Sequence, residues 1–182
     1  MANELPEGAN AKGADDADVA FRASVAEGIV EREASLDDAQ ALLNAAQAEG
    51  ELLFAGTAGA ELLDVLESRT LMGLSPEARV QAHAHMASFL ADFARLRRDA
   101  GASGDALSDD AFQASLDAAL RERGIDRRQL NEMEEQLFMG APAAHKHILK
   151  YLESMPPGAR LAAHIRSVDA FIMWRRLQQA SI

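Results

Sequence analysis

Five histidines are the side chains best suited to chemistry in this 182-residue chain. His83 and His85 stand two residues apart, as do His145 and His147. On a helix this spacing turns the two side chains of a pair roughly 200° apart. Helical metal sites instead use ligands three or four residues apart. The sequence therefore predicts no metal site and no other cofactor.

His145 and His164 are the two histidines that fall on or beside an apolar helical stripe. His145 lies on the stripe of its predicted helix, and His164 flanks the stripe of the last helix. We interpret both as hydrogen-bonded core histidines, since buried polar groups are normally paired. A site built from these two and a distant carboxylate stays geometrically open, although no local pattern signals it.

Familiar catalytic motifs are missing from the sequence. The segment 56–59, Gly-Thr-Ala-Gly, lacks the Gly-Lys-Ser/Thr ending of a phosphate loop. No Gly-x-Ser-x-Gly elbow occurs. The chain has no cysteine, which excludes disulfides, zinc thiolates and a cysteine nucleophile. We therefore predict no catalytic residues and expect a protein that is not an enzyme.

Charge is unevenly distributed along this acidic chain, whose net charge is −11. Residues 141–182 hold six basic and two acidic side chains, whereas residues 1–140 hold 12 basic and 27 acidic ones. This asymmetry suits a soluble protein, and it also suits a basic C-terminal face that meets an acidic surface on another subunit, a partner or nucleic acid.

The N-terminal residues 1–20 show no secretory signal, and no apolar run reaches the roughly 18 residues needed to span a bilayer. Together with the missing cysteines, this favours a cytoplasmic protein without membrane attachment.

Apolar residues recur with a helical period along most of the chain, and no strand-like alternation is found. The sequence predicts an all-α protein, an irregular bundle of about seven or eight helices. Residues 1–15 are Gly-, Asn- and Ala-rich and are expected to be a disordered N-terminal segment. Residues 16–182 are expected to form one helical domain, with a candidate subdomain boundary at 101–107.

Capping residues place the starts and ends of these helices. The expected first helix covers 16–33, the second runs from Ser35 to a stop at Gly50, and Thr57 is expected to cap the third. The segment 51–54 either extends the second helix or forms its own turn. Two further helices are expected over 76–99 and 157–180, and three more are expected to begin at Ser108, Asp126 and residue 142. Hydrophobic staples are expected at 107–112 and 125–130, and a capping box at 126–129.

The helix over 76–99 carries two apolar faces, one of large side chains around Phe93 and one of alanines around Ala87. Two apolar faces predict a central position in the bundle. The alanine face predicts one neighbouring helix at close approach.

The segment 119–130, Ala-Leu-Arg-Glu-Arg-Gly-Ile-Asp-Arg-Arg-Gln-Leu, resembles the opening helices of a helix-turn-helix domain. The resemblance implies a nucleic-acid-binding regulator with a degenerate helix-turn-helix at 116–155 and a basic helix carrying Lys146 and Lys150. An ordinary helical hairpin is the alternative. The net charge argues against nucleic acid, because DNA affinity depends chiefly on phosphate neutralisation.

The end of the last helix is the strongest functional signal in the sequence. Apolar side chains there point in all directions around the helix, next to two arginines and the only Trp. We expect its own fold to leave part of this cluster uncovered, and Trp and Arg are enriched at binding hot spots. The alternative is that this helix is simply the middle of the monomer's core. The sequence thus predicts a cytosolic protein–protein interaction module, an adaptor, chaperone-like or regulatory factor. It would bind a partner protein or a second copy through Phe171, Trp174, Arg175, Arg176 and Leu177.

Overall fold

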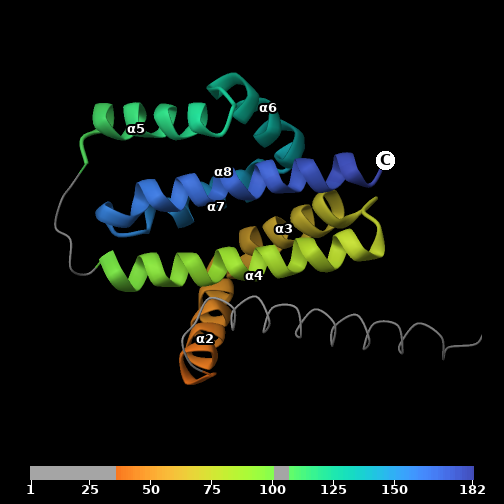
Figure 1. Cartoon of the computed structure of the whole chain (residues 1–182), viewed down its shortest axis with the longest axis horizontal. Helices are drawn as coiled ribbons and strands as arrows, with labels where there is room; N and C mark the ends of the chain where they lie inside the picture. Colours follow the sequence, from red (N-terminus) through yellow and green to blue (C-terminus); the bar gives the residue numbers. More distant parts are fainter. Residues whose placement is uncertain (1–35, 101–106) are drawn as a thin grey trace, which may run out of the picture.

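A computed structural model describes residues 36–100 and 107–182, and within them every element is helical (Figure 1). This confirms the predicted all-α, multi-helix bundle. The predicted disordered segment 1–15, the helix over 16–33 and nearly all of the boundary at 101–107 lie outside the described residues. The elements are α2 (Leu36–Leu53), α3 (Gly56–Leu66), the π-helical turn η1 (Glu67–Leu71), α4 (Pro76–Asp99), α5 (Asp109–Glu122), α6 (Arg127–Phe138), α7 (Pro142–Glu153) and α8 (Pro157–Ala180).

Three predicted helix starts are confirmed by their caps. Ser75 and Ser108 each accept a hydrogen bond from the backbone N–H three residues on, at the starts of α4 and α5. At the start of α6, the carboxylate of Asp126 and the side chain of Gln129 form the expected capping box. These caps satisfy backbone donors that the first helical turn leaves unpaired.

Two local predictions were wrong. Gly50 does not end α2, which continues to Leu53, so the alternative that the segment after Gly50 extends this helix is confirmed. Gly50 instead lies against α4, where an added methyl group would lie 3.3 Å from Leu90 Cδ1. Thr57 caps nothing, because α3 begins one residue earlier, at Gly56, whose φ of +69° makes the turn. Leu107, one of the two residues of the expected staple at 107–112, is exposed.

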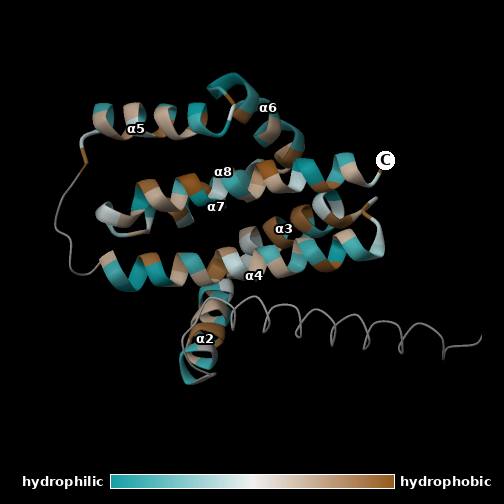
Figure 2. Cartoon of the chain, viewed as in Figure 1, coloured by the Kyte–Doolittle hydropathy of each residue, from teal (hydrophilic) through white to brown (hydrophobic). Residues whose placement is uncertain are grey.

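The helices α4 and α8 form the centre of the bundle, lying side by side and antiparallel (Figure 1). Across the top, α5 packs on α8, while α3 packs on α7 behind. The hydrophobic α3 lies among these helices in Figure 2. The helix α2 crosses α4 and projects below it (Figure 1).

Both apolar faces of α4 are used, which confirms its predicted central position. Phe93 lies in the main core cluster together with residues from α3, α6, α7 and α8. On the alanine face, Ala91 packs against Leu42 and Ala46 of α2, with Ala87 beside them. Small side chains on both helices permit this close approach.

Candidate interaction surface at the end of the last helix

The structure divides the five predicted binding residues between the core and the surface. Phe171 and Trp174 are buried, with only 9% and 8% of their surface exposed. Leu177 is half-buried, and Arg175 and Arg176 are exposed. The expectation that the fold would leave this cluster uncovered was therefore wrong for Phe171 and Trp174, because α8 is central and is covered from several sides.

The two buried aromatic residues anchor α8. Phe171 meets Phe138 of α6 edge-on, with ring centroids 6.4 Å apart and an angle of 88° between the rings. Trp174 belongs to the same core cluster. Its indole Nε1 is buried and makes no hydrogen bond to any described residue. Truncating either side chain would therefore disturb the fold as well as any surface beside it.

Arg69 of η1 joins three segments at this end of the bundle. Its Nη1 donates to the carbonyl oxygens of Leu137 at 2.9 Å and Gln136 at 3.5 Å, at the end of α6. Its own carbonyl oxygen accepts from Gln178 Nε2 of α8 at 3.5 Å. The ends of η1, α6 and α8 consequently lie together (Figure 1).

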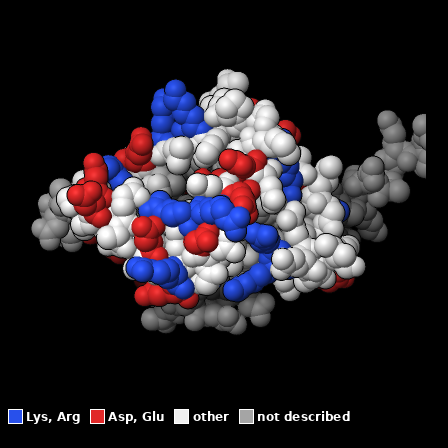
Figure 3. All heavy atoms as spheres, turned by 90° about the horizontal axis from the view of Figure 1, so that it is seen from above, with Lys and Arg blue, Asp and Glu red and all other residues white. Residues whose placement is uncertain are grey.

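Two methionines next to these contacts are strongly exposed. Met72 directly follows η1 and Met139 directly follows α6, and their exposed fractions are 72% and 70%. We group them with Arg175, Arg176 and Leu177, near the end of α8, and call these five residues the end surface. The space-filling view from above shows mostly uncharged side chains toward this end and charged ones over the middle and the opposite end (Figure 3). Exposed apolar side chains that gather in one place mark interaction sites, whereas single ones are ordinary.

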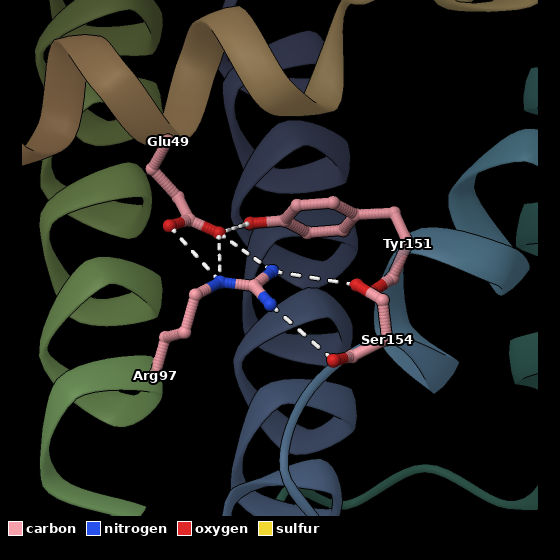
Figure 4. Close-up of polar contacts among 4 residues, drawn as sticks. All are labelled: Glu49, Arg97, Tyr151 and Ser154. Carbon is pink, nitrogen blue, oxygen red and sulfur yellow. Dashed lines mark hydrogen bonds and ion pairs between the residues drawn. The ribbon is translucent and has the colours of Figure 1, made fainter. Parts of the chain in front are cut away.

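A buried polar network holds α2 against the bundle (Figure 4). Glu49 of α2 is only 6% exposed. Its carboxylate accepts from Arg97 of α4, with Nη2 and Nε at 2.9 and 3.0 Å from Oε1, and from the Tyr151 hydroxyl of α7 at 2.6 Å. Arg97 also donates to the backbone carbonyl oxygen of Ser154 at 3.3 Å.

The surroundings of this network shift two pKa values. Burial raises the pKa of Tyr151 far above its ordinary range, and the hydrogen bond to Glu49 adds to the shift. Burial alone would lower the pKa of Arg97, but its hydrogen bond and charge interaction with Glu49 outweigh this and raise it. Both groups are therefore held in their protonated forms. We interpret the network as structural, because every group in it already has a partner.

No local pattern predicts this network, since residues 49, 97 and 151 lie far apart in the chain. One signal was present. Glu49 occupies the apolar stripe of α2 that Leu42, Ala46 and Leu53 also form, so a carboxylate is placed on the buried face. A charge at such a position needs a partner from another helix.

The structure brings His145, His164 and a carboxylate, Glu134, to one small cavity of about 40 Å³. His145 stacks on Phe138 with ring centroids 4.8 Å apart, and its Nε2 lies 3.8 Å from Glu134 Oε2. His164 meets the ring of Phe112 edge-on at 5.2 Å. Both histidines are thus half-buried against aromatic rings. Among residues 36–100 and 107–182, no group of His, Asp and Glu side chains has the geometry to hold a metal ion.

Burial moves two pKa values at this cavity in opposite directions. It raises the pKa of Glu134, and the opposing effects of His145 and Arg127 do not cancel the rise. It lowers the pKa of His164, and the positive charge of Arg160 lowers it further. Both shifts favour the uncharged forms of these side chains.

The region 116–155, for which the resemblance implies a helix-turn-helix, comprises the second half of α5 together with α6 and α7. The third of these helices packs on α3 and α8, and its residues Ala144, Tyr151 and Leu152 are buried. Its exposed basic side chains are Lys146 and Lys150. The exposed residues of α7 share one face along the helix: Pro142, Ala143, Lys146, Leu149, Lys150 and Glu153.

Comparison with known proteins found no matching family model, no similar curated protein and no similar solved structure. In the part of the chain that the structure describes, no helix is both long enough and apolar enough to cross a membrane.

Proposed function

We propose that this chain is a helical protein–protein interaction module that binds a partner protein through the end surface. The observation that carries the proposal is the exposure of Met72 and Met139 at the end where Arg69 ties η1, α6 and α8 together. Methionine side chains are flexible and polarizable, and they are often used at binding surfaces that adapt to their partners.

The chemistry of the end surface defines the partner it fits. Arg175 and Arg176 are exposed beside half-buried Leu177. A complementary partner therefore presents apolar side chains flanked by carboxylates. The apolar contacts would supply most of the affinity, and the arginines would steer association and fix its orientation.

A surface variant tests the proposal without disturbing the core. The double variant Met72→Ser, Met139→Ser removes two exposed apolar side chains. The matched control is Leu107→Ser, which removes an exposed apolar side chain elsewhere in the chain. We expect wild type and control to capture the same protein from native lysate, and the double variant to lose it. Charge reversal of Arg175 and Arg176 should weaken capture and reduce its dependence on salt.

Measuring mass in solution decides whether the partner is a second copy. A concentration-dependent dimer that the double methionine variant abolishes would identify the chain itself as the partner. The proposal is refuted if wild type stays monomeric and captures nothing, or if the methionine variant and the control capture the same proteins equally.

A further inference from the structure

A partly open cavity of about 110 Å³ lies in the bundle, where the end of α2 meets α3, α4, α6, α7 and α8. Buried Phe93, Leu137 and Trp174 form part of its wall, and none of the described residues that line it is charged. Native interiors contain few voids larger than a water molecule. A cavity of this size has room for a small molecule.

The two hydroxyl groups in the wall are already engaged. Thr70 donates to the carbonyl oxygen of Leu66, and Ser167 donates to that of Ala163 at 3.1 Å. A buried water usually makes two to four hydrogen bonds, so this wall holds water poorly. Its chemistry suits an occupant without charge.

We propose that this core cavity binds a small, uncharged, apolar molecule of about the size of one aromatic ring. An engineered cavity of about 150 Å³, lined by Leu, Ile and Phe, stays dry and binds benzene. The core cavity has the same kind of lining and is slightly smaller. Met86 and Met173 lie in its wall, and their unbranched side chains adapt readily to a ligand.

An entry route runs between α4 and α8. Phe89 and Met173 line the core cavity and also an open hollow on the surface, beside Ile172 and Arg176. Both side chains are half-buried. These two side chains therefore lie between the cavity and the surface hollow.

Trp174 is the only tryptophan of the chain and lines the cavity, so its fluorescence reports binding directly. We would titrate the intact protein with ethylbenzene, and with benzoate as a charged probe of similar size. The proposal predicts a saturable change with one ethylbenzene bound per chain and no response to benzoate. A response that does not saturate, or an equal response to both probes, would overturn it.

Filling the cavity provides the matched test. Ala170 of α8 lines the cavity and Ala162 of the same helix does not, and both are half-buried. Ala170→Leu should weaken ethylbenzene binding at least tenfold, whereas Ala162→Leu should leave it within twofold of wild type. Equal binding by the two variants would contradict the proposal.

A second variant covers the case in which Ala170→Leu does not fold. Met86→Ala shortens a side chain of the wall and enlarges the cavity. Naphthalene, which is larger than ethylbenzene, should then bind at least fivefold more tightly to the variant than to wild type. Unchanged naphthalene affinity would place the binding elsewhere and overturn the assignment.

Discussion

Replacing Tyr151 with Phe removes one oxygen atom from the buried network that holds α2. The hydroxyl lies 2.6 Å from Glu49 Oε1, and Glu49 is almost fully buried. Hydrogen bonds to charged groups contribute about 1.5–3 kcal/mol to stability. The variant keeps the ring and with it the edge-on contact to Phe93, at 5.8 Å between centroids. Arg97 still pairs with the carboxylate, so no buried charge is left alone.

We therefore expect Tyr151→Phe to lower the free energy of unfolding by about 1.5–3 kcal/mol. Glu49→Ala should cost more, about 3–5 kcal/mol, because it leaves the Tyr151 hydroxyl and the Arg97 guanidinium without their acceptor. The Arg97 side chain is 27% exposed and can turn toward water, which favours the lower end of that range. A double-mutant cycle should give a coupling energy of about 0.5–3 kcal/mol between the two positions.

Urea unfolding followed by circular dichroism and by Trp174 fluorescence measures these differences. The control is Arg128→Gln, which breaks an exposed pair with Glu132 and should change stability by at most about 0.5 kcal/mol. The reasoning is refuted if Tyr151→Phe costs no more than this control, or if the effects of the two network variants are simply additive.

Phe93→Ala should lower the free energy of unfolding in urea by about 3–5 kcal/mol, because Phe93 lies in the main core; a loss below about 1 kcal/mol would contradict its burial. Burial raises the pKa of Glu134 above 4.5, so stability falls as pH rises past that value and the carboxylate ionises. Glu134→Gln should therefore raise the thermal midpoint at pH 7 and have little effect at pH values below 4.5, and a lower midpoint at pH 7 would show that its ion pair outweighs burial. The lowered pKa of His164 works in the opposite direction, so stability falls as pH drops below 6.5. His164→Gln should flatten this part of the pH–stability profile, and an unchanged slope would assign the acid sensitivity to other groups.

Helix positions followed from local chemistry and were largely predictable. The capping box at Asp126 and the Ser-Pro start at 75–76 specify backbone hydrogen bonds within a few residues, so the sequence alone locates them. Gly50 was misread because its role is not local. It depends on Leu90 of another helix, which no local pattern reveals.

The candidate site was harder to predict than the fold. The apolar spread around Trp174 was recognised correctly, but whether such a cluster is core or surface depends on how many helices surround it. Met72 and Met139 lie 67 residues apart and gain meaning only when Arg69 brings their segments together. Contacts of this kind depend on tertiary packing, which a single sequence does not encode in any short pattern.

The central position of α8 has a consequence for how the chain is made. Because α8 follows α2 to α7 in the sequence, the ribosome completes every helix of the core before the one that closes it. At about 5–20 residues per second, translation of its 24 residues takes roughly 1–5 s. During that interval the apolar surfaces that later cover Val168, Phe171 and Trp174 face solvent or a chaperone. Synthesis therefore includes an aggregation-sensitive interval, and a pause in translation within the α8 codons would lengthen it.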